Sequence, residues 1–255
     1  MNLIFRGYDA LGDFMSNNGM IRYLSNSYDI VKVETTFPVF VNNLFRDNKN
    51  IQTIFPHDVP KINSNDNYDH MDVLIHDNVK PLGVYKTLYN KHYKYGNVVN
   101  QTINNNASEF YSTMGLDVNL RIDNFYYERD LIKENDLYNS LSNEKYTLIC
   151  QYDNCLINRK YISDNNIINI HKMSDNICTL IKLIEEAEEV HLVENSIALL
   201  VYHMQHKNLM KDVKINLHTY SRKEPHRICN GPDFNNFYLN MLMYPKLSNW
   251  NFIYE

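Results

Sequence analysis

The feature that most limits the possible folds is a repeated alternation between short apolar runs and longer segments with helical periodicity. Strand-like runs occur at 2–7, 29–36, 51–55, 71–77, 146–153, 167–171, 190–195 and 213–221. Segments with apolar residues at helical spacing occur at 14–26, 37–48, 176–190 and 196–207. Such an order is typical of parallel sheets covered by helices, so the sequence predicts an α/β protein with two Rossmann-like halves.

The pattern also predicts where the halves meet. We expect an N-terminal Rossmann-like domain over 1–120 and a C-terminal one over 121–255, with parallel sheets facing a central cleft. The stretch 83–145 is rich in Tyr, Asn and charged residues and lacks a Pro/Ser-rich linker, so we expect helices and a crossover there. The last 30 residues or so are expected to fold back on the first half.

Composition excludes several classes of protein. The net charge of −5 lacks the basic excess of a protein that coats DNA or RNA, so no nucleic-acid partner is expected. The four cysteines form no C-x-x-C pair, which favours free thiols in a reducing compartment. No secretory signal and no apolar run of about 18 residues is present, so we expect a cytoplasmic protein without a transmembrane segment.

Glycine is concentrated near the start of the chain. Only seven glycines occur, and three of them, Gly7, Gly12 and Gly19, lie in or beside the stretch "YDALGDFMSNNGMIRYL" at 8–24. Their spacing matches neither the dinucleotide fingerprint nor the phosphate loop of nucleotide hydrolases. Asp13 follows Gly12 where the first helix is expected to begin. It is either the N-cap of that helix or a carboxylate that faces a crevice and acts as a general base.

Two further turns suit an anionic ligand. Glu194, Asn195 and Ser196 join an expected strand to an expected helix, where Asn195 or Ser196 is a good N-cap and free N–H groups could receive a diphosphate. Ser221 and Arg222 follow the last expected strand, and arginine there suits a phosphate or carboxylate. Taken alone, an ordinary capped turn and a solvated basic turn explain these stretches as well.

Motifs of other reaction classes are missing from the sequence. The ten histidines include His203 and His206 on an expected helix and His191 and His218 on expected strands, without an H-E-x-x-H pattern or a Cys/His pairing. No convincing D-x-D pair and no G-x-S-x-G elbow occurs. We therefore expect no metal and no cofactor.

Four stretches in this order carry a resemblance: "GDFMSNNGMIRYL", "FYSTMGLDVNLRIDNFYYERD", "IKLIEEAEEVHLVENSIALLVYHM" and "INLHTYSRK". Together they resemble glycosyltransferases of the two-domain GT-B type, in particular the heptosyltransferase-like and fucosyltransferase-like branches and small relatives in giant viruses and microbes. Such relatives often read "I-D-S-S" in the third stretch. Here Glu194 and Asn195 stand in place of the aspartate and the first serine.

The resemblance implies an inverting, metal-independent transfer of a sugar from a nucleotide-sugar to a glycan or other hydroxyl acceptor. It implies donor binding by the second half, through Glu194, Asn195, Ser196, Tyr220, Ser221 and Arg222. On the acceptor side it implies Asp13 as the catalytic base, with Gly12, Asn18 and Arg22 shaping the site. For a viral protein, the location would be the host cytoplasm.

Two alternatives remain open at this point. The chain could be a noncatalytic carbohydrate- or nucleotide-binding module of the same fold, or an epimerase-like enzyme that acts on the nucleotide-sugar itself. The sequence does not identify the sugar, the nucleotide, the acceptor or the oligomeric state.

Overall fold

The computed structural model describes about two thirds of the chain, in two compact units. The described residues are 2–6, 11–58, 71–76, 81–86, 111, 115–141, 144–151, 155–162, 166–171, 173–193, 195–210, 212–218 and 250–253, with the backbone alone described for 71–76 and 81–86. The described residues up to Glu128 belong to the first unit, and those from Arg129 belong to the second. The segment 121–128, which the sequence analysis assigns to the second half, therefore packs with the first unit.

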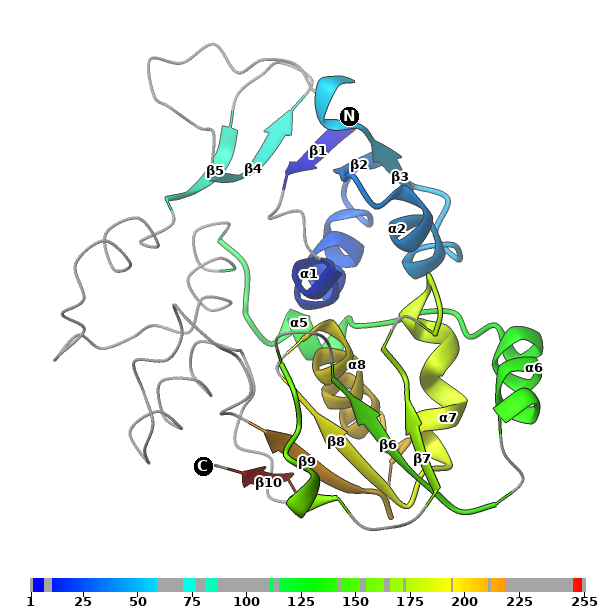
Figure 1. Ribbon diagram of the computed structural model, residues 1–255. Coiled ribbons are helices and arrows are strands. Elements are labelled where there is room, and N and C mark those ends of the chain that lie inside the picture. The colour runs from blue at the N-terminus through cyan, green and yellow to red at the C-terminus, as the bar shows by residue number, and fades with distance from the viewer. Residues whose placement is uncertain are drawn as a thin grey trace, which may run out of the picture. The chain divides into compact units, whose positions relative to one another are not determined.

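The first unit contains a five-stranded sheet and three described α-helices (Figure 1). Its elements are β1 (Asn2–Arg6), α1 (Leu11–Leu24), β2 (Ile30–Glu34), α2 (Pro38–Leu44), β3 (Ile51–Ile54), the 3-10 turn η1 (Pro56–Asp58), β4 (Met71–His76), β5 (Pro81–Lys86) and α5 (Leu120–Asp123).

The strand order in this sheet is β3-β2-β1-β4-β5. β1, β2 and β3 are parallel, with Leu3 opposite Val31 and Val31 opposite Ile51. β4 runs antiparallel to β1, and β5 antiparallel to β4. The strand expected at 71–77 is therefore present, but its direction differs from the parallel one expected. An apolar run shows the period of a strand but carries no information on its direction.

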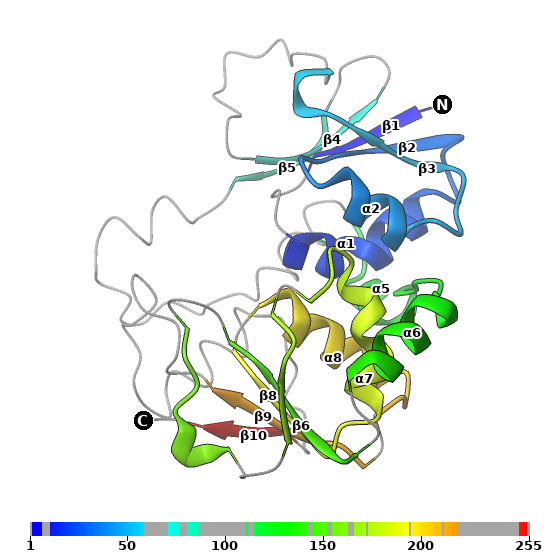
Figure 2. The same cartoon turned by 45° about the vertical axis from the view of Figure 1, so that its right-hand side comes forward.

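The helix α1 is buried on nearly all sides. Phe14, Met15, Met20 and Ile21 are at most 1% exposed, and the polar side chains between them are buried as well. A helix buried all round needs neighbours on both sides. α1 follows β1 along the chain and packs against α5 on another side (Figure 2). Its polar side chains therefore need hydrogen-bond partners inside the protein.

The second unit contains a five-stranded parallel sheet with α7 and α8 on one side (Figure 2). Its elements are α6 (Leu131–Leu141), β6 (Tyr146–Cys150), η2 (Arg159–Tyr161), β7 (Asn166–Asn169), η3 (Ile177–Leu180), α7 (Ile181–Glu185), β8 (Glu189–Leu192), α8 (Ser196–His206), β9 (Lys214–His218) and β10 (Trp250–Ile253).

The order of its strands, β10-β9-β8-β6-β7, is the 2-1-3-4-5 order of doubly wound folds when β6 is counted as the first strand. All four pairings are parallel. The predicted α/β class is thus confirmed, with a fully parallel second sheet and with β1, β2 and β3 parallel in the first sheet. β10 lies in this second sheet, beside β9. The rest of 226–255 lies outside the described residues.

The two faces of the second sheet differ in polarity. The face toward α7 and α8 is apolar, with Leu148, Val190, Leu192, Ile215 and Leu217 all at most 1% exposed. On this face the Tyr146 hydroxyl donates to the Leu183 carbonyl of α7, and the Trp250 indole N–H donates to Gln205 of α8. The opposite face carries the buried polar side chains Thr147, His191, Asn216 and His218. Strands of parallel sheets are usually apolar on both faces, so this polar row needs an explanation.

An ion-pair cluster attaches α6 to α7 in the second unit. Arg129 pairs with Glu134 of α6, whose side chain is fully buried. It also donates to both carboxylate oxygens of Glu185 of α7, at 2.7 and 2.8 Å. Although burial opposes the charge, hydrogen bonds to Glu134 and Glu185 raise the pKa of Arg129. A buried carboxylate is tolerated here because the guanidinium binds it directly.

Candidate functional site

The turn between β8 and α8 lies where a doubly wound sheet usually binds its ligand. β6 and β8 are adjacent, and their chains continue in opposite directions across the sheet, which makes this pair the switch point. Ligands of open α/β sheets bind at the carboxyl ends of the strands at such a point. Cys150 ends β6, and Asn195 and Ser196 follow β8 here.

Asn195 is the N-cap of α8. The sequence analysis named Asn195 and Ser196 as the two candidates for this position, and the first is confirmed. Asn195 Oδ1 accepts hydrogen bonds from the N–H groups of Ile197 and Ala198, both at 3.0 Å. Two of the free donors that begin a helix are therefore already used. Of the residues at this helix start, Ser196 still offers its hydroxyl and backbone N–H to an anion.

The same asparagine connects the turn to β6. Asn195 Nδ2 donates to Cys150 Sγ at 3.1 Å, which ties the start of α8 to the end of the neighbouring strand. Burial raises the pKa of the Cys150 thiol to about 11, against the smaller opposing effect of Asn195. Cys150 is thus a protonated thiol at neutral pH, and it acts as a structural partner of Asn195 rather than as a nucleophile.

A chain of three titratable side chains runs along the polar face of the second sheet. Glu189 and His191 lie on β8, two residues apart, and His218 ends β9. His191 Nε2 lies 3.3 Å from Glu189 Oε1, and His191 Nδ1 lies 2.8 Å from His218 Nε2. Both rings are at most 1% exposed, and they stack with their centroids 5.1 Å apart. The ring of Tyr161, in η2, packs against His218 at 5.7 Å.

The carboxylate fixes the tautomers of both histidines. Burial opposes ionisation of Glu189, but hydrogen bonds from Lys214 at 2.6 Å and Asn216 at 2.7 Å lower its pKa below the usual value. A carboxylate only accepts hydrogen bonds, so His191 donates to it through Nε2–H. His191 Nδ1 then accepts, and the donor to it is Nε2–H of His218. We assign these protons from the hydrogen-bond network.

Both histidines are neutral at physiological pH. Burial lowers the pKa of His191, although Glu189 acts against it. Burial, with a smaller contribution from His191, lowers the pKa of His218 to about 3. The polar row is thus a satisfied network of one carboxylate and two neutral rings.

Asp13 lies inside the first turn of α1. The helix begins at Leu11, so Asp13 is a helical residue and not the N-cap that one hypothesis placed there. A carboxylate in the first turn is favourable because it faces the positive end of the helix dipole. Asp13 is half-buried, and Gly12 beside it accepts a hydrogen bond from the Ser16 hydroxyl at 3.0 Å. The first turn of α1 is at the same sheet edge as the ends of β2 and β3.

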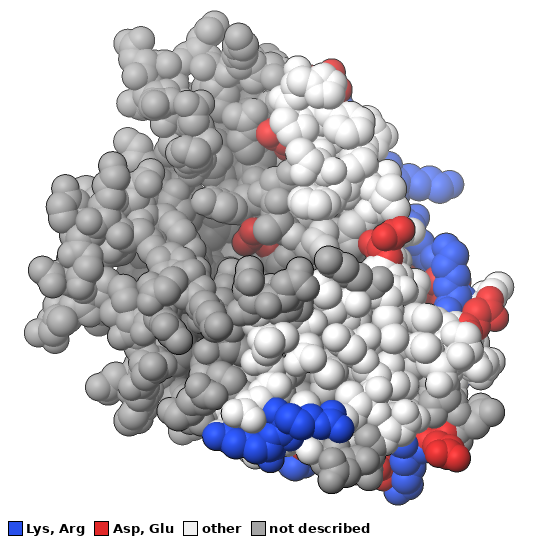
Figure 3. Space-filling view, in the orientation of Figure 1, with Lys and Arg blue, Asp and Glu red and all other residues white. Residues whose placement is uncertain are grey.

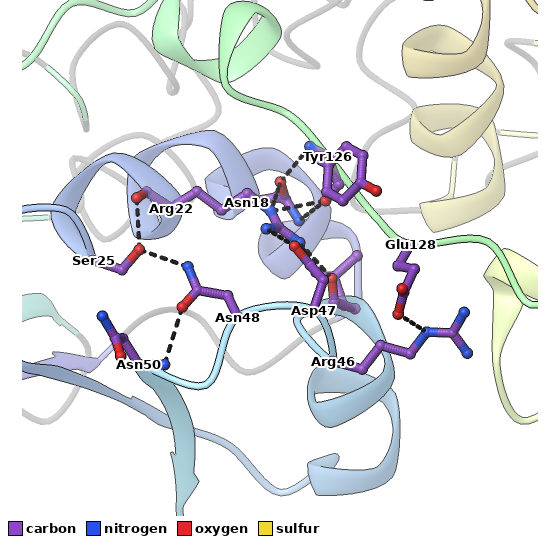
Figure 4. A network of polar contacts seen from close by, with 10 residues as sticks. Asn18, Arg22, Ser25, Arg46, Asp47, Asn48, Asn50, Tyr126 and Glu128 are labelled. Atoms are coloured by element: carbon purple, nitrogen blue, oxygen red, sulfur yellow. Dashed lines mark hydrogen bonds and ion pairs between the residues drawn. The ribbon is translucent and has the colours of Figure 1, made fainter.

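Asn18 and Arg22 belong to a structural network, in place of the acceptor-side role expected of them (Figure 4). Asn18 is fully buried, and its amide exchanges two hydrogen bonds with the backbone of Tyr126, both at 3.0 Å. Arg22 forms a bidentate ion pair with Asp47 at 2.7 and 2.8 Å.

The remaining contacts of this guanidinium are also internal. It donates to the carbonyl oxygens of Leu44 and Tyr126, and it lies over the rings of Phe45 and Tyr126 at 5.3 and 5.0 Å. All three guanidinium nitrogens of Arg22 are therefore engaged within the unit. We exclude Asn18 and Arg22 from the acceptor site for this reason.

Gly19 explains part of the glycine concentration through packing. A Cβ built on Gly19 would lie 2.0 Å from the Leu120 carbonyl oxygen and 3.1 Å from Cα of Arg121. Only glycine allows the backbone of 120–121 to approach α1 so closely. The Tyr111 hydroxyl also contacts α1: it donates to the Ser16 carbonyl and accepts from the Met20 N–H. Burial raises the pKa of this tyrosine.

The other predicted donor residues, Glu194, Tyr220, Ser221 and Arg222, lie outside the described residues. Sequence reasoning noted that His191 and His218 lie on strands but did not pair them. The alternation of side chains along a strand could have indicated this pairing. His191 lies on the same face of its strand as Glu189, and His218 lies on the same face of its strand as Asn216. The pairing itself depends on β8 and β9 being neighbours, which the sequence does not state.

Comparison with protein-family models and with curated proteins finds no match to this chain. Among the described helices none is long and apolar enough to cross a membrane. The described part of the face in Figure 3 carries its Lys/Arg and Asp/Glu side chains in separate small groups. Within the described ranges, no group of three or more His, Cys, Asp or Glu side chains is arranged to hold a metal ion.

Proposed function

We propose that the protein is a glycosyltransferase of the GT-B type, which transfers a sugar from a nucleotide-sugar to a hydroxyl acceptor. The observation that carries the proposal is the second unit, whose 2-1-3-4-5 parallel sheet has an Asn195-capped helix at its switch point. This is the position at which doubly wound folds bind nucleotides. The first unit supplies a second set of parallel strand ends, with Asp13 in the helix turn that follows β1.

In this proposal the second unit binds the donor. The Ser196 hydroxyl and N–H receive the diphosphate, while Asn195 holds the helix start in place. Arg222, with Tyr220 and Ser221, would add charge to the diphosphate site, and Glu194 would accept hydrogen bonds from the ribose. These assignments rest on the resemblance in the sequence. Helix N-termini and cationic side chains stabilise a leaving diphosphate.

Asp13 is proposed as the base on the acceptor side. Its carboxylate takes the proton of the acceptor hydroxyl while the oxygen attacks the anomeric carbon opposite the diphosphate. The bond from this carbon to the diphosphate breaks, and the nucleoside diphosphate leaves with the electron pair. The configuration at the carbon is inverted. A positioned general base typically contributes a factor of about 10² to 10⁴ to the rate.

A binding screen followed by one variant tests the proposal. Nucleoside diphosphates and their sugar conjugates are added singly to the full chain, and the correct donor should raise Tm by mass action. With that donor, Asp13→Asn should lower kcat by about 10² or more and leave donor binding unchanged. Asp123→Asn is the control, because Asp123 is an exposed carboxylate of the same unit.

Four outcomes would contradict the proposal in different ways. Absence of any nucleotide effect on Tm would remove the donor site. Nucleotide binding without turnover in the unchanged protein would favour a noncatalytic binding module. Conversion of the nucleotide-sugar without an acceptor would favour an epimerase-like enzyme. Unchanged turnover in Asp13→Asn would remove Asp13 as the base.

A further inference from the structure

Two phenylalanines are exposed at the carboxyl edge of the first sheet. Phe37 directly precedes α2 and is 42% exposed, and Phe55 directly follows β3 and is 46% exposed. Both leave the sheet side by side, because the Thr35 N–H donates to the Ile54 carbonyl at 3.0 Å where β2 and β3 end. In Figure 2, α2 begins at the edge to which β2 and β3 run. Exposed apolar groups at such an edge often mark a ligand site.

Local contacts fix the backbone at Phe37 and the ring of Phe55 before any ligand binds. The Phe37 N–H donates to the Thr35 hydroxyl at 2.8 Å, and Pro38 begins α2 directly afterwards. The ring of Phe55 stacks on His57 with centroids 5.6 Å apart and an interplanar angle of 16°. Since ordering a free side chain on binding costs free energy, a ring that is held in place, as that of Phe55 is, binds a ligand at a smaller cost.

Polar side chains lie directly beside the rings. His57 and Asp58 form a pair at 3.6 Å on η1, and their side chains are 76% and 57% exposed. The first turn of α1, with Asp13, belongs to the same edge because β1 is parallel to β2. The edge therefore combines aromatic faces with groups that donate and accept hydrogen bonds.

We propose that Phe37 and Phe55 form an aromatic platform that stacks on a sugar ring of the acceptor, whose hydroxyls His57 and Asp58 bind. A pyranose has an apolar C–H face with partly positive hydrogens, which suits the negative face of an aromatic ring, and a rim of hydroxyls. This inference rests on the proposed function and names the chemical class of its acceptor. It also gives the acceptor side a new set of residues in place of Asn18 and Arg22.

A sugar fits this edge better than a protein partner does. A stable protein interface buries about 800 Å² on each side and has an apolar centre of several residues. Here each ring is flanked by exposed polar residues, since Thr36, His57 and Asp58 are all exposed. Two rings flanked by polar groups match single sugar units and not a continuous apolar contact.

Saturation-transfer NMR on the full chain tests the platform without a donor. The probes are the methyl glycosides of glucose, galactose, mannose, fucose, N-acetylglucosamine and heptose. We expect saturation of the C–H face of at least one probe. Phe55→Leu, which stays apolar but has no aromatic face, should weaken its binding about threefold to tenfold. Phe55→Trp should retain binding.

Ile132→Ala is the matched control, because Ile132 is an apolar residue of α6 that is 75% exposed. It should bind the probe as the unchanged protein does. Absence of saturation for every probe, or equal binding by Phe55→Leu, overturns the platform. Self-association in sedimentation experiments that Phe55→Ala abolishes would overturn it too and assign the edge to a second copy. Because nucleotide binding is measured separately, the platform can fail while the donor site stands.

Discussion

The two units each bury a polar network, and the networks differ in what holds them together. In the first unit an ion pair between Arg22 and Asp47 joins α1 to the segment after α2. In the second unit, one carboxylate organises two neutral histidines, His191 and His218, across adjacent strands. Arginine stays charged at any pH that a protein tolerates, whereas histidine changes its charge near neutrality. The stability that the second network provides should therefore depend on pH.

The largest effect is expected from breaking the charged network. Arg22→Ala leaves Asp47 without its guanidinium and removes a hydrogen bond from the Leu44 carbonyl and from Asn18. Removal of one partner of a buried pair costs about 3–5 kcal/mol, and we expect about 3 kcal/mol because the Asp47 side chain keeps 22% exposure. Urea unfolding followed by circular dichroism measures this loss.

Arg46 provides the matched control for that experiment. It pairs with Glu128 at 2.9 Å, but the two side chains are 30% and 51% exposed (Figure 4). Exposed pairs contribute about 0–1 kcal/mol, so Arg46→Ala should change the free energy of unfolding little. Similar losses in both variants would show that Arg22 acts as a surface arginine and would contradict the structural role assigned to it.

A smaller effect that depends on pH is expected in the second unit. The pKa values of His191 and His218 are lowered in the folded protein, that of His218 to about 3, whereas an unfolded histidine titrates near 6.5. Between these values the unfolded chain binds more protons, so the free energy of unfolding decreases as the pH falls from about 6.5 toward 3. The stabilising contribution is fully present above about pH 6.5.

His218→Phe tests this dependence. At pH 7 it removes the donor to His191 Nδ1 and leaves a buried acceptor unsatisfied, a loss of about 1–3 kcal/mol. Between pH 7 and 5 its stability should fall less steeply than that of the unchanged protein, because one buried histidine no longer titrates. Parallel curves for His218→Phe and the unchanged protein would exclude His218 as the source of the pH dependence.

The comparison also shows how far the sequence leads. Apolar periodicity predicted every described strand except β5 and β10, because a strand's period is visible in its own residues. It also predicted the Asn195 turn. It could not show that Asn18 and Arg22 are internal, since their partners Tyr126 and Asp47 lie 108 and 25 residues away. The direction of β4 and the pairing of His191 with His218 likewise depend on which strands become neighbours.

Gly12, Asp13 and Gly19 show the same limit within a single stretch. The resemblance implied a ligand-site role for Gly12 and Asp13, whereas no role was expected of Gly19. Gly19 is instead required by the approach of Leu120, which is a contact between residues about a hundred positions apart. Asp13 remains a candidate base because it lies in the first turn of α1, the helix that follows β1 along the chain. The role of Asp13 therefore stays a prediction, whereas the contacts of Asn18, Gly19 and Arg22 depend on distant residues that local sequence does not show.

The smallest expected effect comes from neutralising Glu189, and it sharpens the description of the histidine network. Glu189→Gln keeps an oxygen for Lys214 and Asn216 but removes the charge, so we expect a loss of about 1 kcal/mol. Without a carboxylate, His191 is no longer required to donate through Nε2, because the Asn216 amide, 3.5 Å away, can donate to that nitrogen instead.

Two-bond ¹H–¹⁵N spectra should show both histidines as Nε2–H in the unchanged protein and a new Nδ1–H population in the variant. Glu188→Gln, at the neighbouring carboxylate that pairs with Lys145, should leave both tautomers unchanged. Nδ1–H rings in the unchanged protein would mean that Glu189 does not set the tautomers, and the contrast between the two networks would then depend on burial alone.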